Sequence, residues 1–428
     1  MISGEQAASD MADSHGLYPG WIVLAACFLC AMLVIGGSIY IYQLFVLPVT
    51  AELGITRGEA SYAFIAFLFG IALWSPLIGR LFDRVSARVL MPLGGLAYAA
   101  GMIIISQAAS PIVMLAAVPT FLGLAMALAG GLAANTITTR WFARRRGRAL
   151  GIAAIASSAG GFAMLPLVTF LIERFGWRDA LLFTGCGAGL IIVLIALVFV
   201  RDRPGRALIA RYGESAAADA SPTDASAALG DPLFGFGDIV KTARFWMITL
   251  AVGLLLASDQ AVLTTQFPYF VDIGFSATQA TTIITAMTGS AIIGKLLVGF
   301  LAERWDIRWL YVFVALFHAL LLGALLLQPG YFAMLAFVSI FGAAVGGIYP
   351  VWSVLCSQAF GARSFGTAFG ATAMFTQALA IVFVGFINGT FDKTGSYQSA
   401  YLAFLGAIVA GVGAIALLRL PATDGRHS

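Results

Sequence analysis

The stretch TTIITAMTGSAIIGKLLVGFL, Thr281–Leu301, decides the class of this protein. It is apolar and long enough to cross a bilayer, because about 20 helical residues span ~30 Å of hydrocarbon. Lys295 lies inside it, although a charge within such a span costs roughly 2.5–3.5 kcal/mol on insertion scales. Asp259 is the one acidic residue well inside another hydrophobic stretch. A buried cation and a buried anion on neighbouring segments indicate a path for a charged solute.

The composition of the whole chain favours a membrane protein. Of its 428 residues, 61% are hydrophobic and only 10% are charged, which leaves too little polar surface for a soluble protein of this length. The net charge of +4 is small, and in a membrane protein it reflects the loops rather than nucleic-acid binding. The first 18 residues are polar and lack Lys and Arg, so we expect a disordered N-terminus without a cleavable signal.

Twelve apolar runs predict an all-α membrane protein with twelve transmembrane helices in two six-helix repeats. The expected spans are residues 20–47, 60–79, 89–108, 112–138, 149–172, 180–200, 245–270, 277–301, 309–328, 331–358, 366–388 and 399–418. The expected domains are a disordered cytoplasmic N-terminus (1–18), an N-terminal bundle (19–201), a cytoplasmic linker (202–242), a C-terminal bundle (243–420) and a cytoplasmic tail (421–428). The linker contains a low-complexity run, ESAAADASPTDASAALGD.

The positive charges predict the orientation of these spans. With both termini in the cytoplasm, 19 of the 24 Lys and Arg residues fall inside, 4 fall outside, and Lys295 lies within a span. Cytoplasmic loops carry such an excess of Lys and Arg. We therefore expect a multi-pass protein with cytoplasmic N- and C-termini.

The two halves of the chain repeat each other. GRLFDR at Gly79–Arg84 returns as GFLAER at Gly299–Arg304, an offset of 220 residues. The pair Gly130–Gly131 returns as Gly346–Gly347, an offset of 216 residues. Matches in the same order at nearly constant offset indicate a duplicated six-helix unit. Parallel repeats of this kind place a substrate site between the halves, near the bilayer midplane.

These features resemble the major facilitator superfamily. Its signature loop, G-x-x-x-D-R-x-G-R-[KR], is matched in GRLFDRVSAR by Gly79, Asp83, Arg84 and Arg88, with Ser86 in place of the usual Gly. The resemblance implies a transporter in which this loop gates the cytoplasmic face. Gly would let two helices approach closely, while Asp and Arg would cap helix ends and pair across the closed face. The alternative is that the arginines are only positive-inside signals.

Further segments narrow the resemblance to one branch of the superfamily. They are YPGWIVL (Tyr18–Leu24), RWFARRRGRALG (Arg140–Gly151), FGWRDALLFTG (Phe175–Gly185) and GGIYPVW (Gly346–Trp352). These segments are similar to the bacterial branch that contains monocarboxylate transporters and the oxalate–formate exchanger, which implies the cell inner membrane. Members of this branch bind the substrate carboxylate through a basic residue on helix 8, and Lys295 occupies that position.

The resemblance also bears on the substrate and its coupling. The exchanger has a second basic residue on helix 11, where this chain has Thr372, and one cation favours a monoanion over a dianion. Proton-coupled animal members carry an Asp one turn before the helix 8 Arg, where this chain has Ala291. Asp259 is our own candidate for proton coupling. The alternatives are that Lys295 snorkels towards the headgroups, or that Asp259 only neutralises a buried charge.

Four aromatic residues are candidates for lining a substrate cavity. Tyr349 follows the Gly-Gly pair of helix 10 and matches, by resemblance, an aromatic in the exchanger's cavity, and Trp352 lies nearly one turn further on. Tyr40 and Tyr42 on helix 1 are similar candidates. Such residues would enclose a small anion and offer hydroxyl donors, although aromatics in membrane helices also serve packing and the interface.

The sequence thus predicts a secondary transporter whose two halves rock about a central site. We expect a small organic monocarboxylate as substrate, a proton as coupling ion, and a monomer in the lipid bilayer. The alternatives are carboxylate exchange, export of another small solute, and a non-transporting membrane sensor. We expect no cofactor, metal, nucleic acid or catalytic residue, because the three histidines lie apart and no carboxylate cluster or ATP-binding loop occurs.

Overall fold

The computed structural model describes residues 18–142, 146–202, 204, 235–302 and 304–418. Within these residues, helices joined by short turns account for nearly the whole chain. Twelve of the helical stretches are long and apolar enough to cross a membrane, and each of the twelve predicted spans has its counterpart. The all-α, twelve-span prediction is therefore confirmed. The expected disordered N-terminus, most of the linker and the C-terminal tail lie outside the described residues.

The first six spans form the N-terminal half. Its elements are α2 (Gly20–Ile35), η1 (Gly36–Tyr40), α3 (Tyr42–Leu53), α4 (Arg57–Arg84), α5 (Ala87–Ser106), α6 (Pro111–Ala117), η2 (Val118–Leu122), α7 (Gly123–Ala129), α8 (Gly131–Trp141), α9 (Arg146–Phe175) and α10 (Trp177–Phe199). Spans one and four each contain a π-helical segment, η1 and η2. Thr56 starts α4 with a capping box to Glu59, which satisfies two backbone groups at the helix end.

The last six spans form the C-terminal half, preceded by a short helix. Its elements are α13 (Phe236–Val240), α14 (Ala243–Asp272), α15 (Ala277–Leu301), α16 (Ile307–Leu327), α17 (Tyr331–Thr394) and α18 (Gln398–Ala416). α17 holds two spans, Tyr331–Gly361 and Thr367–Thr394. They are separated at Gly361, where φ is 74°. Only glycine adopts this left-handed conformation without strain, so Gly361 marks the turn between the two spans.

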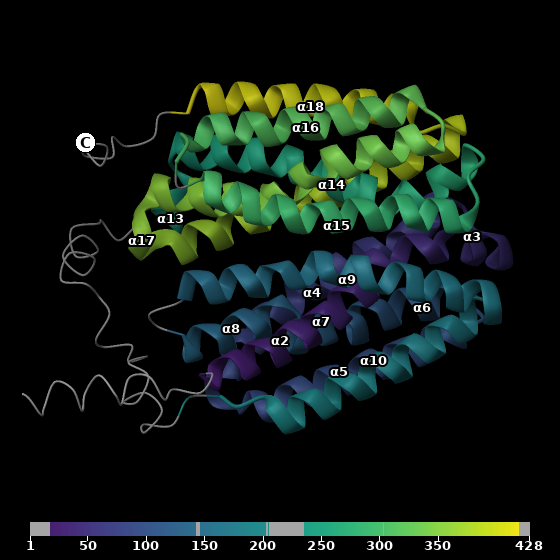
Figure 1. Ribbon diagram of the computed structural model, residues 1–428, viewed down its shortest axis with the longest axis horizontal. Helices are drawn as coiled ribbons and strands as arrows, with labels where there is room; N and C mark the ends of the chain where they lie inside the picture. The colour runs from purple at the N-terminus through teal and green to yellow at the C-terminus, as the bar shows by residue number, and fades with distance from the viewer. Residues whose placement is uncertain (1–17, 143–145, 203, 205–234, 303, 419–428) are drawn as a thin grey trace, which may run out of the picture.

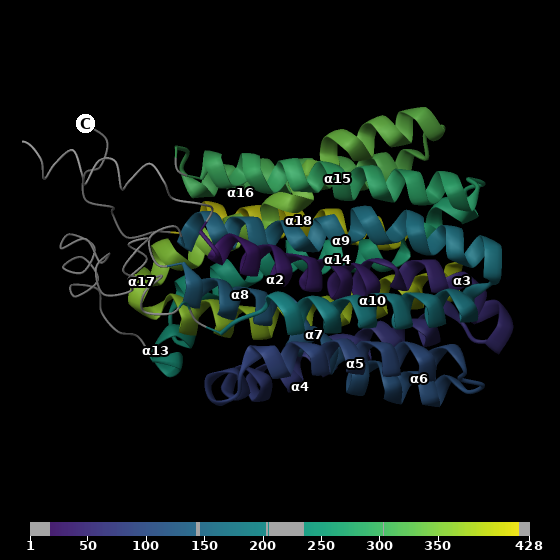
Figure 2. The same cartoon turned by 60° about the horizontal axis from the view of Figure 1, so that its bottom comes forward.

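The long helices of both halves run along one common direction, and the halves lie side by side (Figure 1). α15 of the C-terminal half packs against α9 of the N-terminal half, and α17 packs against α4. Figure 2 shows the same bundle from a second direction. We call the end where α3 meets α4 the Arg57 end, and the end where α10 stops and α13 starts the linker end.

Two apolar cores hold the bundle together. One contains residues of both halves, such as Phe45 and Phe267 near the Arg57 end. The other belongs to the N-terminal half alone and gathers near the linker end, around Phe82, Leu90 and Trp141. The halves therefore share one core towards the Arg57 end, while the N-terminal half keeps a separate core towards the linker end.

Candidate functional site

Close packing of α15 against α17 positions the helix that carries Lys295. A Cβ added at Gly294 would lie 1.7 Å from the carbonyl oxygen of Ala343, and one added at Gly346 would lie 2.1 Å from that of Ala291. No larger residue fits at either position without moving the helices apart. The two glycines thus fix the position of Lys295 at the boundary between the halves.

The ammonium group of Lys295 crosses from the C-terminal half to α9 of the N-terminal half. Its Nζ donates to the carbonyl oxygen of Ala154 at 2.9 Å and to Oγ of Ser157 at 2.5 Å. The lysine is half-buried, and both partners are neutral oxygens. A full positive charge is therefore held in mid-protein by groups that do not neutralise it.

Asp259 provides the opposite charge from α14, where it is half-buried in mid-span. The charges of Asp259 and Lys295 interact electrostatically. No ion pair within 4.0 Å joins these two residues. The carboxylate and the ammonium therefore attract one another without contact, and both stay available to a bound ion.

Two of the predicted aromatic residues, one from each half, interact electrostatically with Asp259. Tyr349 on α17 exposes 47% of its surface, and its hydroxyl interacts with Asp259. Tyr40, at the end of η1, interacts with both Asp259 and Tyr349, and Ser158 lies within hydrogen-bonding reach of its hydroxyl. Electrostatic interactions thus link Lys295 to Asp259, and Asp259 to Tyr40 and Tyr349.

Trp352 supports this group without presenting a free polar atom to it. The indole is 3% exposed, its Nε1 donates to Oγ1 of Thr372 at 2.9 Å, and its ring stacks on Phe369. The ring centroid of Trp352 lies 5.8 Å from that of Tyr349. Thr372, which replaces the exchanger's second basic residue, is therefore engaged in holding the tryptophan behind Tyr349.

Tyr42 lies apart from Lys295. Its hydroxyl donates to the carbonyl oxygen of Ala60 at 3.0 Å, and its ring packs against Phe64 within the N-terminal half. It lines a separate pocket of that half. The helix explains the difference from Tyr40, because residues two positions apart point in widely different directions.

Sequence reasoning missed the residues of α9 that hold Lys295. Ser157 and Ser158 were visible as two consecutive serines in the apolar segment ASSAGGFAMLP, which is an available signal for a polar site within a span. The carbonyl oxygen of Ala154 gives no such signal, because every residue carries one.

The signature loop makes its contacts within the N-terminal half. Oγ of Ser86 hydrogen-bonds to Asp202, whose other oxygen accepts from the backbone N–H of Ala87 at 2.5 Å. Arg88 donates to the carbonyl oxygen of Leu197 at 2.9 Å. Asp202 and Ser86 together thus satisfy the start of α5.

Other positions of the loop are open. A Cβ at Gly79 would meet none of the described atoms within 4 Å, so the part of the chain that the structure describes shows no close helix approach there. Arg84 is exposed, and the side chain of Asp83 lies outside the described part of the chain. The gating role of Gly79, Asp83, Arg84 and Arg88 stays a prediction.

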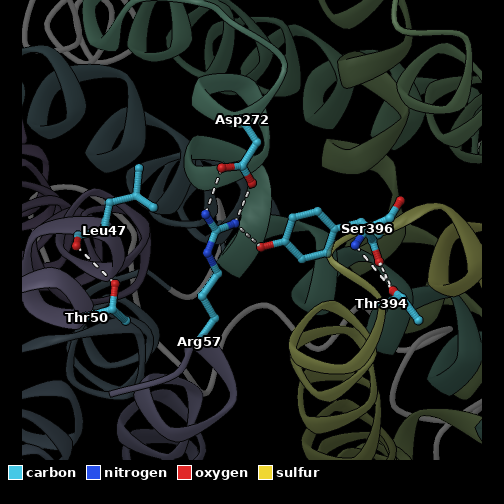
Figure 3. Close-up of polar contacts among 7 residues, drawn as sticks. Leu47, Thr50, Arg57, Asp272, Thr394 and Ser396 are labelled. Atoms are coloured by element: carbon cyan, nitrogen blue, oxygen red, sulfur yellow. Dashed lines mark hydrogen bonds and ion pairs between the residues drawn. The ribbon is translucent and has the colours of Figure 1, made fainter. Parts of the chain in front are cut away.

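A charged cluster ties the two halves together at the Arg57 end. Arg57 on α4 makes a bidentate ion pair with Asp272 on α14, with N–O distances of 2.5 and 2.8 Å (Figure 3). It also donates to the hydroxyl of Tyr397 at 2.8 Å, and its guanidinium lies 4.0 Å from the ring centroid of Phe391. Next to it, the backbone N–H of Gly58 donates to a carboxylate of the other half. Arg57 thus bonds to two segments of the C-terminal half at once.

Further hydrogen bonds join the halves between the Arg57 end and Lys295. The backbone N–H of Phe267 donates to Oε1 of Gln43 at 3.0 Å, and the hydroxyls of Thr169 and Thr281 lie 2.7 Å apart. Together with the Arg57 cluster, they connect the halves from the Arg57 end down to Lys295.

The chain has twelve spans in two halves, and a charged group lies at the boundary between these halves. A family model described as Major Facilitator Superfamily matches residues 27–385. The chain belongs to the Major Facilitator Superfamily. The superfamily resemblance drawn from the signature loop is therefore confirmed.

Relatives within the superfamily include both kinds of transporter that the sequence segments indicated. Human monocarboxylate transporter 12 is 25% identical over 403 residues, which cover 90% of this chain and 77% of that protein. The oxalate:formate antiporter of Oxalobacter formigenes is 27% identical over 257 residues, covering 60% of this chain and 56% of the antiporter.

A solved structure of the superfamily shares the fold. The crystal structure of a bacterial homolog to the human lysosomal transporter Spinster, in an inward-facing and unoccupied conformation, superimposes with a TM-score of 0.65. The match covers 94% of this chain and 96% of that one, at 18% identity, which shows a common fold.

Proposed function

We propose that this superfamily member carries a small organic monocarboxylate across the bacterial inner membrane, together with a proton. The observation that carries the proposal is Lys295, a mid-span cation that donates hydrogen bonds to two neutral oxygens of the other half. A carboxylate is a stronger partner for an ammonium group than a carbonyl or a hydroxyl. The relatives named monocarboxylate transporters and oxalate:formate antiporter support the same substrate class.

Substrate binding would exchange one set of contacts at Lys295 for another. In this structure Nζ joins α15 to α9 through Ala154 and Ser157. A bound carboxylate takes over the ammonium group, and it loosens the link between the halves at the point about which they rock. Because Lys295 is one point charge without a second cation near it on helix 11, a monoanion is better matched than a dianion.

Protonation of Asp259 links the proton to this exchange of contacts at Lys295. An ionised Asp259 repels an incoming carboxylate, whereas a protonated one does not and can donate a hydrogen bond to it. Tyr40 and Tyr349, which interact with Asp259, supply further hydroxyl donors. Carboxylate and proton therefore favour each other's binding, which is the requirement for symport.

The orientation proposed here places the Arg57 end outside and the linker end in the cytoplasm. The excess of Lys and Arg in the segments of the linker end supports it. Since the halves are joined at the Arg57 end, the conformation is then closed to the outside. The Spinster homolog that shares the fold was captured facing inwards.

Uptake of radiolabelled monocarboxylates into proteoliposomes tests the proposal. Wild type should accumulate a monocarboxylate under an inward proton gradient. Lys295→Ala should lower the flux tenfold or more, while Asp259→Asn should keep carboxylate-specific flux but lose its dependence on the gradient. The matched control is Lys393→Ala, which removes an exposed lysine at the Arg57 end.

The outcomes separate the proposal from its alternatives. Flux that survives Lys295→Ala undiminished removes the argument for an anionic substrate and favours a neutral solute. Flux that needs a carboxylate on the opposite side, but no gradient, indicates exchange. Saturable binding without any flux indicates a sensor.

A further inference from the structure

Within the described part of the C-terminal half, three buried hydrogen bonds join α14 to α16. Two run from a tyrosine hydroxyl to a backbone carbonyl oxygen, and one joins a serine hydroxyl to Nε2 of a histidine at 3.2 Å. From the linker end to the Arg57 end, the pairs are Tyr311 with Ala251, His318 with Ser258, and Tyr269 with Leu325. All of these residues are at most 4% exposed, so the bonds are shielded from competing groups.

The spacing of the three bonds places them on one face of each helix. Their residues on α16 are seven positions apart, and those on α14 are seven and eleven positions apart. Seven and eleven residues are close to two and three turns, so the bonded residues of each helix lie almost directly above one another. The bonds extend from Ala251 to Tyr269, along ~27 Å of helix. Bonds distributed in this way fix the rotation of α14 about its own axis.

α18 leaves room for the bond nearest to the linker end. Both α14 and α16 pack against α18. A Cβ added at Gly411 of α18 would lie 2.7 Å from the hydroxyl of Tyr311 and 3.3 Å from the carbonyl oxygen of Ala251. A larger residue at Gly411 would therefore displace the hydroxyl from its acceptor. The bonds between α14 and α16 are thus part of a closely packed group of three helices.

His318 is the residue of this set that packing alone does not explain. It interrupts the apolar segment FVALFHALLLG of α16 and is fully buried. Among the described residues, its other ring nitrogen, Nδ1, has no hydrogen-bond partner. Burial of an imidazole is costly unless it is hydrogen-bonded, and an apolar side chain would pack in this segment at less cost. The bond to Ser258 is therefore the feature that accounts for a histidine here.

Ser258 lies directly before Asp259 in α14. Ser258 faces α16, and the next residue of a helix points about 100° further round. Asp259 is thereby turned away from α16. It interacts instead with Lys295 on α15, Tyr40 in η1 and Tyr349 on α17. The rotation at which α14 is held thus sets the position of this carboxylate relative to the three other groups.

We propose that His318 is a positioning residue for Asp259: through its bond to Ser258, it holds α14 at the rotation that directs the carboxylate towards Lys295. Within the proposed transport function, on which this inference rests, that rotation allows protonation of Asp259 to act on a carboxylate bound at Lys295. The two tyrosine bonds hold α14 nearer its ends. Loss of the His318 bond therefore releases α14 in mid-span, next to Asp259.

Cysteine reactivity tests the rotation of α14 without any transport. In a full chain without other cysteines, Asp259→Cys or Ala257→Cys is introduced, and its reaction with a methanethiosulfonate reagent is timed. Asp259 is half-buried, whereas Ala257 is fully buried on the other side of Ser258. The cysteine at position 259 should react at least tenfold faster than the one at position 257. His318→Leu should lower this ratio at least threefold, because a released α14 exposes the two sides more equally.

Three further variants show whether the bond itself is responsible. Ser258→Ala removes the same bond from α14 and should lower the ratio as His318→Leu does, which also covers a His318→Leu protein that fails to fold. His318→Gln keeps a polar nitrogen near the position of Nε2 and should keep the ratio. Tyr311→Phe removes a bond between the same helices ~12 Å from residue 259, and it should keep the ratio as well.

Two results would overturn the proposal. The first is an unchanged ratio in both His318→Leu and Ser258→Ala. The second is an equal fall in Tyr311→Phe, because the bond of His318 would then contribute to general packing in the same way as any other bond of α14. Size-exclusion profiles report the folding of each variant.

Flux measurements then connect the position of Asp259 with proton coupling. In proteoliposomes, His318→Leu should keep carboxylate uptake without a gradient but lower its stimulation by an inward proton gradient at least fivefold. Tyr311→Phe and His318→Gln should keep the stimulation. Full stimulation in a His318→Leu protein whose reactivity ratio has fallen would overturn the link to coupling. A fallen ratio in a protein without any carboxylate flux would reject the transport function and leave the positioning of Asp259 by His318 standing.

Discussion

Tyr40 and Tyr349 belong to opposite halves of the molecule, and the charge of Asp259 acts on both hydroxyls. Lys295 likewise belongs to one half and finds its oxygen partners in the other. A ligand that replaces any of these contacts alters how strongly the halves are joined. At the scale of residues, the hydrogen bonds of Lys295 are therefore contacts through which a ligand would act on the link between the halves.

Removal of either hydroxyl should weaken substrate binding. Tyr349→Phe and Tyr40→Phe should each raise the KM for a monocarboxylate by about three- to tenfold, which corresponds to the ~0.5–1.5 kcal/mol of one neutral hydrogen bond. Uptake kinetics in proteoliposomes measure the effect, with Tyr331→Phe, at the far start of α17, as control. An unchanged KM in both variants would place the two tyrosines outside the substrate site.

A single residue could be predicted from the sequence where its type differs from that of its neighbours. Lys295 was recognisable because a charge stands out in an apolar run, and Asp259 for the same reason. The backbone oxygen of Ala154 and the separation of Tyr42 from Tyr40 were not recognisable, because both depend on how one helix faces another. Packing partners of this kind follow from the folded arrangement rather than from residue type.

Helix contacts, at the next scale, are set by small residues. Gly294 and Gly346 allow α15 and α17 to touch backbone to backbone, and this contact holds the helix that carries Lys295. The spans themselves were predictable, because hydrocarbon thickness fixes their length. The π segments η1 and η2 were not, since GGSIY and VPTFL are ordinary apolar sequences that carry no signal for an extra residue per turn.

Gly294→Ala should separate α15 from α17 and destabilise the protein. The added Cβ would lie 1.7 Å from a backbone oxygen of α17, which cannot move aside as a flexible side chain could. We expect a clear drop in Tm, by several degrees, in a detergent-solubilised thermal unfolding assay.

Gly299→Ala is the control for this prediction on the same helix. A Cβ at Gly299 meets nothing within 4 Å. Alanine there should leave the Tm unchanged or raise it slightly, since alanine is the better helix former by about 1 kcal/mol. Equal Tm values for the two variants would contradict the packing described between α15 and α17.

For the molecule as a whole, the Arg57 cluster is a charged link between the halves. Its two charges, Arg57 and Asp272, lie 215 residues apart in sequence, and each stands near the end of a span. Charges at span ends are also what topology requires, and in the sequence Arg57 is simply one of the four positive charges expected outside. The duplicated architecture was thus predictable, but the ion pair that joins its halves at the Arg57 end was not.

Breaking this ion pair should shift the conformational equilibrium. Charge-assisted hydrogen bonds contribute roughly 1.5–3 kcal/mol each, so Asp272→Asn should favour opening at the Arg57 end by tenfold or more. A cysteine at Thr281, which is buried between the halves, should then react faster with a maleimide in a background without other cysteines.

A charge swap provides the control for the ion pair. Arg57→Asp combined with Asp272→Arg should restore slow labelling, whereas either single change should not. Equal labelling rates in wild type, the single variants and the charge swap would show that the ion pair does not hold the halves together.

The opposed charges of Lys295 and Asp259 have an electrical consequence. The empty site sums to zero, and a site loaded with one carboxylate and one proton also sums to zero. Neither half of the cycle then moves charge across the bilayer, although each elementary charge would otherwise gain about 2.3 kcal/mol from 100 mV. Uptake should therefore be equal with the membrane potential clamped at zero or at −100 mV by a potassium ionophore. A cell using such a carrier would concentrate an acid at the expense of its pH difference alone, and its membrane voltage would remain untouched.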